Sequence, residues 1–236
     1  MIYVGIDDTD MPNTPGTNQL AKALAAELAA EWPCRLIVRH QLLQDARVPF
    51  TSKNSSAALL LEDRKDTSLD ELIASLRDVV RERAVDGSDA GLCVARYVPQ
   101  AIGAYGRRCQ AELVTQQEAY DLASCWNIHL EGLGGTNDGV IGALAAVGLV
   151  AGGNDGRVVQ IGDWPDDLSG SQAISVLQER HVRVRCLDSD SSVESGTIDV
   201  GKHLRPNYRE GRIVLFARRA ASQGKESDAW EAVRLT

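Results

Sequence analysis

The chain has 236 residues, enough for one large domain or two small ones, and its 44% hydrophobic and 25% charged residues are typical of soluble globular proteins. A formal net charge of −8 and an aromatic content of 5% disfavour an extended nucleic-acid interface, while leaving room for a small nucleotide. Five cysteines without a Cys-x-x-Cys pair argue against a disulfide framework or zinc ribbon, and without a charged-then-apolar leader or a long apolar stretch we expect a cytoplasmic protein with no membrane partner.

The first part of the chain alternates between apolar runs and amphipathic segments. Apolar spacing predicts a strand at 2–6, a helix at 17–31, strands at 36–43 and 57–61, a helix capped by Thr67 or Ser68 that runs to residue 83, and a strand at 91–98. The resulting β-α-β-β-α-β order is that of a ferredoxin-like fold, an antiparallel sheet with both helices on one face.

The second part is less regular and follows a possible linker at 99–106. Patterning predicts helices at 115–126, 140–150 and 169–180 and strands at 157–161, 182–187, 196–200 and 213–217, while residues 220–236 are expected to fray. The predicted fold class is therefore α/β (α+β). A ferredoxin-like half at 1–105 would pack against a second mixed α/β half at 106–236 that carries a glycine-rich loop.

Three carboxylates stand at the end of the first predicted strand. Asp7, Asp8 and Asp10 would repel one another unless a cation lay among them, and Mg²⁺ held with water and phosphate oxygens is the usual solution. On an extended chain Asp8 and Asp10 share a face, so they are the predicted metal pair. Asp7 would point the other way and orient the backbone or take a proton, and Thr9 would cap or contact phosphate. Such clusters are also ordinary turn chemistry.

Two segments could place phosphate near these acids. Gly16 and Thr17 open the first helix, whose N-terminus favours phosphate; Thr17 would be an N-cap, a phosphate ligand or a phosphate acceptor. A second, glycine-rich segment leads into the predicted helix at 140–150, and its backbone N–H groups could cradle phosphate at Asn137, Asp138, Gly139 and Gly142. Small residues at these positions could equally serve close packing of the helix on a sheet.

Basic and polar loops provide candidate anion ligands. In the polar loop at 47–56, Lys53 or Arg47 could neutralise a phosphate and Asn54 could fix it, although a solvated loop is the simpler interpretation. A later basic loop that contains Lys202, Arg205 and Arg209 could also reach an anion. The four histidines show no metal-ligand spacing.

These motifs together resemble the tRNA(Ile2) 2-agmatinylcytidine synthetase family. The resemblance rests on the run Gly5-Ile6-Asp7-Asp8-Thr9-Asp10 with Thr17 at matched spacing, on the segment from Asp138 to Gly148, and on the position of the loop from Pro49 to Ala57. It implies a ferredoxin-like domain, a kinase-like domain, and binding of ATP and agmatine. It further implies that the amine is joined to a cytidine through a phosphorylated intermediate, that the three aspartates serve phosphate and magnesium chemistry, and that Thr17 matches a phosphorylated threonine.

This sequence differs from that family in features that bear on the expected substrate. This chain lacks the zinc ribbon's cysteine pairs and ends before an OB-fold, and its loop reads Thr51-Ser52-Lys53-Asn54-Ser55-Ser56 where the family has Lys-Thr-Arg-Gly-Asn-Gly. We therefore expect an ATP- and Mg²⁺-dependent ligase-like or kinase enzyme that acts on a small molecule. An amine such as agmatine is the candidate substrate, and tRNA is not an expected one. The alternative is a non-catalytic sensor of a nucleotide or amine.

Overall fold

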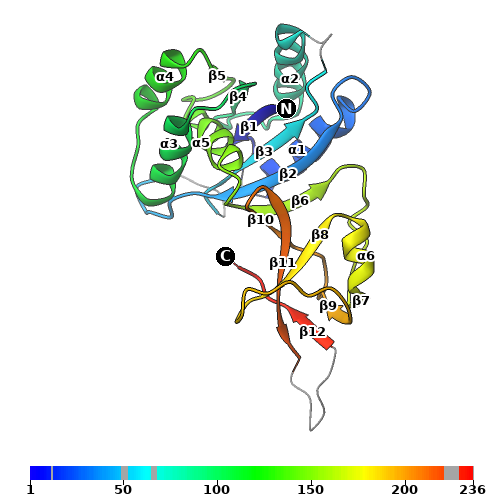
Figure 1. The fold of residues 1–236 in the computed structure, drawn as a ribbon. Helices are drawn as coiled ribbons and strands as arrows, with labels where there is room; N and C mark the ends of the chain where they lie inside the picture. Colours follow the sequence, from blue (N-terminus) through cyan, green and yellow to red (C-terminus); the bar gives the residue numbers. More distant parts are fainter. Residues whose placement is uncertain (12, 49–52, 65–67, 221–228, 236) are drawn as a thin grey trace.

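The secondary structure follows the predicted α/β pattern along most of the chain. The computed structural model describes residues 1–11, 13–48, 53–64, 68–220 and 229–235 (Figure 1). Its helices are α1 (Thr17–Glu27), α2 (Leu69–Arg83), α3 (Gln100–Ala111), α4 (Gln116–Cys125), α5 (Gly139–Ala151) and α6 (Ile174–Glu179). Its strands are β1 (Ile2–Asp7), β2 (Cys34–Gln41), β3 (Ser55–Leu61), β4 (Gly91–Ala95), β5 (His129–Gly132), β6 (Arg157–Ile161), β7 (Ser171–Ala173), β8 (Val182–Cys186), β9 (Thr197–Asp199), β10 (Asn207–Arg209), β11 (Arg212–Arg219) and β12 (Ala229–Ala232).

One part of the sheet has the strand order expected from the sequence. Strands β4, β1, β3 and β2 lie side by side in that order, and each neighbouring pair is antiparallel. Alternate side chains of β1, from Ile2 through Val4 to Ile6, share a core with apolar residues of α1 and α2. Both helices therefore cover the same face, which confirms the predicted β-α-β-β-α-β arrangement.

The opposite face of this sheet is covered by α5, with α3 and α4 packed beside it (Figure 1). The helix approaches unusually closely because both sides of the contact are small. A Cβ atom added at Gly5 of β1 would lie 2.0 Å from the Ala143 carbonyl oxygen, and one at Gly91 of β4 would lie 2.2 Å from Gly139. The glycine- and alanine-rich sequence of α5 thus serves close packing of helix on sheet.

Substituting Gly5 by Ala tests this close approach. The added methyl group would force α5 away from β1, and we expect the free energy of unfolding to fall by about 3 kcal/mol, as for severe overpacking. Chemical denaturation measures the loss. Gly103→Ala in α3 is the matched control, because its nearest contact would be an acceptable 3.5 Å and alanine favours helix. Equal stability of Gly5→Ala and the wild type would contradict the packing.

Helix α3 occupies the segment in which a linker at 99–106 was expected. Its glycines suggested a loop, but Ile102, Tyr105 and Cys109 recur at helical spacing and are buried against α5. Gly106 permits this contact, since a Cβ there would lie 2.9 Å from the carbonyl oxygen of Ala145. The linker expectation was wrong because close helix packing selects the same residues as a turn.

The remaining strands form a second lobe that joins the first through β6 and β10 (Figure 1). Strands β8, β9, β11 and β12 enclose a separate apolar core with α6. The helix expected at 169–180 is shorter, because residues 171–173 pair with β9 as strand β7. Strands β5, β10 and β12 were not predicted. Helices α3, α4 and α5 lie with the sheet of the first lobe. The predicted domain boundary at residue 105 stays a prediction.

No helix in the described part of the chain is both long and apolar enough to cross a bilayer.

Candidate functional site

A single cavity brings together most of the residues predicted to form a site. It lies where β1 ends, α1 and α5 begin, and the loop between β2 and β3 returns to the sheet. The predicted residues in its lining are Asp7, Asp8, Asp10, Thr17, Arg47, Lys53, Asn54, Asp138 and Gly142. Thr9, Gly16, Asn137 and Gly139 lie in the adjoining segments and do not line it. The later basic loop with Lys202, Arg205 and Arg209 does not line it either.

All three aspartates of the first cluster line this cavity, but Asp7 packs against α5 whereas Asp10 accepts a hydrogen bond from Thr17 of α1. That Asp7 points away from the metal pair stays a prediction. Asp8 has φ of 50°, a left-handed conformation that ends the extended run after Asp7 and that aspartate tolerates better than most residues. The Asp7 carboxylate packs directly against α5. A Cβ atom at Gly142 would lie 1.7 Å from Asp7 Oδ2, so only glycine leaves room for this side chain.

The cluster carries its negative charge at a cost in free energy. Burial raises the pKa of Asp7 to about 8, and the neighbouring carboxylates of Asp8 and Asp10 add to the shift. Burial also raises the pKa of Asp8 to about 6, with further contributions from Asp89, Asp10 and Asp138. A bound cation would stabilise the ionised forms.

The donor set fits Mg²⁺ better than a metal that needs a complete protein cage. Within the described residues, no group of three or more His, Cys, Asp or Glu side chains has the geometry of a preformed metal site. Mg²⁺ commonly takes one or two carboxylates and completes its shell with water and phosphate oxygens. Asp8 and Asp10 in a shared cavity meet that smaller requirement.

Thr17 is part of a short hydrogen-bonded chain at the edge of the acidic cluster. Thr9 Oγ1 donates to Thr17 Oγ1 over 3.2 Å, and Thr17 Oγ1 donates to Asp10 Oδ1 over 3.2 Å. Gly16, in extended conformation, is the N-cap of α1, so Thr17 is the first helical residue and not the cap. Its buried hydroxyl is thus directed by a carboxylate and reaches the cavity, as a phosphate ligand or acceptor requires.

The start of α5 is arranged differently from the predicted phosphate cradle. The Gly139 N–H donates to the Asp89 carbonyl over 3.0 Å, and the next two N–H groups, of Val140 and Ile141, donate to carbonyls of the preceding loop. These N–H groups are used within the protein and do not present themselves to a ligand. Asn137 packs against Gly132, which leaves Asp138 and Gly142 as the parts of this segment at the cavity.

The loop between β2 and β3 forms the opposite wall. Asn54 fastens this loop, because its Nδ2 donates to the Leu43 carbonyl over 2.7 Å and its own carbonyl accepts from Leu42. Arg47 pairs with Asp45 over 2.8 Å, whereas Lys53 makes no ion pair with any described residue. Lys53 is therefore the more available cation at this wall. Residues 49–52 of the predicted loop lie outside the described part.

Several lining residues were missed by sequence reasoning. Cys109 at the end of α3 and Glu112 and Leu113 directly after the helix line the cavity. Sequence reasoning missed them because it interpreted the segment before them as a linker. The helical spacing of buried residues in α3 was the available signal. Asp89 does not line the cavity, but it raises the pKa of Asp8 and was also missed. Nothing in its local sequence brings it near Asp8, because that proximity depends on how β4 pairs with β1.

Comparison with solved structures identifies proteins that share the fold of this chain. The sequence matches no protein-family model and no curated protein. Among solved structures, a tRNA fluorescent labeling enzyme matches with a TM-score of 0.55 at 23% identity over 62% of this chain and 35% of the other. A complex of TiaS with tRNA(Ile2) and ATP matches with a TM-score of 0.56 at 23% identity over 62% and 36%. Apo TiaS, named tRNAIle2 agmatidine synthetase, matches with a TM-score of 0.52 at 22% identity.

These matches define the α/β fold class of the chain. It shares the TiaS-like fold, which confirms the structural side of the resemblance seen in the sequence. The matched region spans about a third of the length of those proteins, according to the coverage of 35% and 36%.

Proposed function

We propose that this protein is an ATP- and Mg²⁺-dependent enzyme that joins an amine to a phosphate-activated small substrate. The observation that supports this most strongly is the convergence of Asp7, Asp8, Asp10 and Thr17 on one cavity with Lys53 at the facing wall. Solved complexes of TiaS with tRNA(Ile2) and ATP, and with tRNA(Ile2), AMPCPP and agmatine, support a nucleotide and an amine as ligands.

Asp8 and Asp10 are the proposed magnesium ligands. When bound, Mg²⁺ would neutralise charge on the phosphates and align them. Lys53, from the loop between β2 and β3, would stabilise phosphate charge at the other side of the cavity. The N-terminus of α1, which begins at Thr17, adds a favourable dipole for an anion.

Asp7 is the proposed general base. Its raised pKa of about 8 places its titration near neutral pH, where a group can both accept and release a proton. Phosphorylation of a substrate oxygen makes it a leaving group. Asp7 would then take the proton of the amine as the C–N bond forms and the C–O bond to the leaving phosphate breaks.

The cavity also suits an amine with an aliphatic chain. Leu42, Leu113 and Ile141 supply an apolar wall beside the carboxylates, so methylene groups and a cationic end would each find matching surroundings. Agmatine has this character. The acidic composition supports a small second substrate in place of tRNA, although the neighbours named above include tRNA complexes.

The proposed role of the Thr17 hydroxyl can be tested by substitution. Thr17→Val keeps the shape but removes the group that donates to Asp10, and we expect turnover to fall about 100-fold, as when one positioned catalytic donor is lost. Thr17→Ser should retain most activity, which separates loss of the hydroxyl from loss of packing. Phosphoprotein analysis by mass spectrometry would reveal whether the residue carries phosphate during turnover. Full activity of Thr17→Val would exclude any chemical role.

Nucleotide consumption tests the proposed function directly. The protein is incubated with ATP, Mg²⁺ and a panel of amines led by agmatine, together with nucleosides and other small acceptors, and ADP, AMP and phosphate are separated by chromatography. We expect consumption that requires both an amine and an acceptor. Binding of nucleotide or amine without consumption under any combination would favour a sensor and contradict the proposal.

A further inference from the structure

Consecutive residues at the start of α1 face two different cavities. Thr17 lines the acidic cavity described above, whereas Asn18 lines a second cavity that is bounded by α1, β6 and the loops that precede β7 and β10. The charged and amide side chains of the second cavity include Asn18, Lys22, Arg157, Asp166 and Arg205. Its lining therefore contains three cationic side chains and one carboxylate, although the protein as a whole has a net charge of −8.

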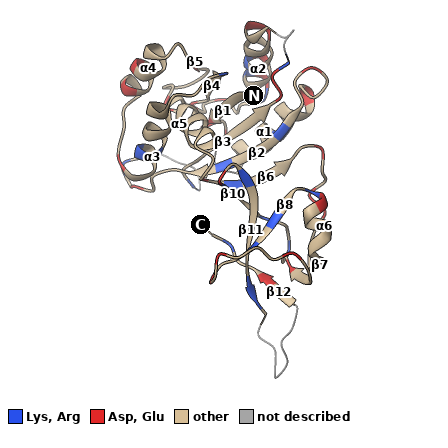
Figure 2. Ribbon diagram, in the orientation of Figure 1, with Lys and Arg blue, Asp and Glu red and all other residues tan. Residues whose placement is uncertain are grey.

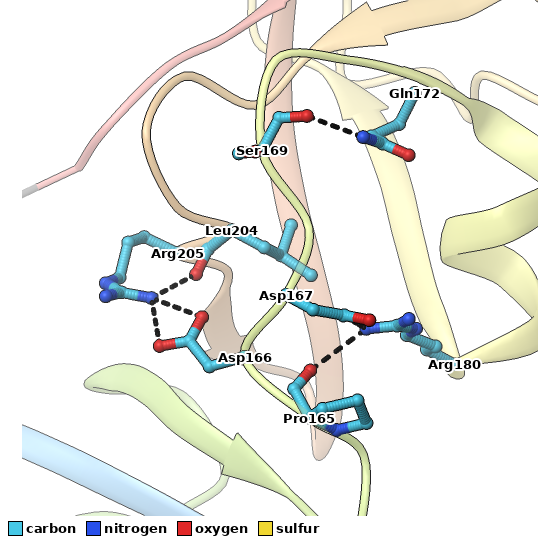
Figure 3. Close-up of polar contacts among 8 residues, drawn as sticks. All are labelled: Pro165, Asp166, Asp167, Ser169, Gln172, Arg180, Leu204 and Arg205. Carbon is cyan, nitrogen blue, oxygen red and sulfur yellow. Dashed lines mark hydrogen bonds and ion pairs between the residues drawn. The ribbon is translucent and has the colours of Figure 1, made fainter.

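The carboxylate of this second cavity is already engaged. Asp166 lies 3.1 Å from Arg205 Nη1 and 4.0 Å from Lys22 Nζ, and Figure 3 shows its two oxygens turned toward the Arg205 guanidinium. Arg180 fixes the same loop, since its Nη1 donates to the Pro165 carbonyl and to Asp167 (Figure 3). Asp166 is held in place and is shared between two cations, so it leaves positive charge uncompensated.

Arg157 is the least compensated of these cations. It makes no ion pair with any described residue, and its Nε is buried without a hydrogen-bond partner. Burial lowers the pKa of Arg157, and the guanidinium groups of Arg39, Arg205 and Arg234 lower it further. Figure 2 shows basic segments near β10 and β11, where the two lobes meet. A half-buried guanidinium among other cations is costly unless an anion binds to it.

Asn18 contributes a second unsatisfied group of a different kind. Its Oδ1 is buried and accepts no hydrogen bond from the protein. Buried polar atoms without partners are rare, and here the two residues that carry such atoms, Asn18 and Arg157, line the same cavity. A ligand that satisfies both carries an anion and a hydroxyl or amine donor.

We propose that this second cavity binds the phosphomonoester group of a small molecule. Arg157 would contact the phosphate, with Lys22 and Arg205 adding charge, and Asn18 would accept a hydrogen bond from a hydroxyl of the same molecule. This proposed site involves neither ATP nor the aspartate cluster, so it can be tested separately from the proposed reaction.

Calorimetric titration without Mg²⁺ and ATP tests the site, with inorganic phosphate and ribose 5-phosphate as probes. We expect one saturable site with higher affinity for ribose 5-phosphate. Arg157→Gln should weaken both probes about tenfold or more, the loss typical of a hydrogen bond to a charged group. The matched control is Arg183→Gln, which removes an exposed arginine of β8 away from the cavity and should bind as the wild type does.

Two further measurements guard against a fold defect in Arg157→Gln. Phosphate should raise the melting temperature of the wild type more than that of Arg157→Gln at the same phosphate concentration. Asn18→Ala should weaken ribose 5-phosphate and leave inorganic phosphate unaffected. Absence of saturable binding, equal affinity of Arg157→Gln and wild type, or binding of oligonucleotides but of neither small probe would each overturn the proposal.

Discussion

Asp8→Asn is expected to lower the rate of ATP consumption by about a thousandfold, the upper range for loss of one preorganised electrostatic group. The substitution keeps the size of the side chain but removes a proposed magnesium ligand. It also removes one source of repulsion in the cluster, because the pKa of Asp8 is raised to about 6 by burial and by the neighbouring acids. The variant should therefore fold at least as stably as the wild type.

Steady-state assays over a range of Mg²⁺ concentrations measure this effect. Asp78→Asn, an exposed position on α2, is the matched control and should retain full activity. Circular dichroism would establish that both variants are folded. Turnover of Asp8→Asn within a few-fold of the wild type would show that Asp8 is not a magnesium ligand.

The second large effect concerns stability as a function of pH. In the folded protein burial raises the pKa of Asp7 from 3.8 to about 8, so the folded state binds this proton more tightly than the unfolded chain does. The stabilisation is complete below pH 4 and is lost as the pH rises toward 8. Each pKa unit corresponds to about 1.4 kcal/mol, so the Mg²⁺-free protein should lose several kcal/mol across this interval.

Urea denaturation at pH 5, 6.5 and 8 in the presence of a chelator measures how the free energy of unfolding changes with pH. Asparagine cannot ionise, so Asp7→Asn should remove most of this pH dependence of stability. The control variant Asp78→Asn should preserve it. Because a cation favours the ionised carboxylates, Mg²⁺ with nucleotide should restore stability at pH 8. A slope that is the same in Asp7→Asn and the wild type would mean that Asp7 is not the buried titrating group.

The first lobe was predictable because its elements are encoded locally. Apolar spacing identified β1, α1, β2, β3, α2 and β4, and the known order of such elements supplied the topology. Strands β5, β10 and β12 have three or four residues each, too few to show alternation. Strand β5 pairs with β4, and β10 pairs with β6, across long stretches of chain that single-sequence patterning does not connect. The hairpin of β10 with β11 is local and was overlooked.

The candidate site was predictable in membership but not in geometry. The density of carboxylates at the end of β1 indicated Asp7, Asp8 and Asp10, and all three line the cavity. Their directions could not be derived from strand alternation alone, because the positive φ of Asp8 ends the extended run after Asp7. The glycines before and within α5 were open to two interpretations, and the contacts favour close packing, with Gly142 accommodating Asp7.

The most direct test of the central claim is the position of a metal ion in a crystal grown with Mn²⁺ and a non-hydrolysable ATP analogue. Mn²⁺ replaces Mg²⁺ at oxygen sites and gives an anomalous signal that locates it without ambiguity. We expect one peak at the Asp8 and Asp10 carboxylates, with the triphosphate beside it and Lys53 facing the phosphates. A nucleotide bound in another cavity, or Mn²⁺ bound away from both carboxylates, would contradict the assignment.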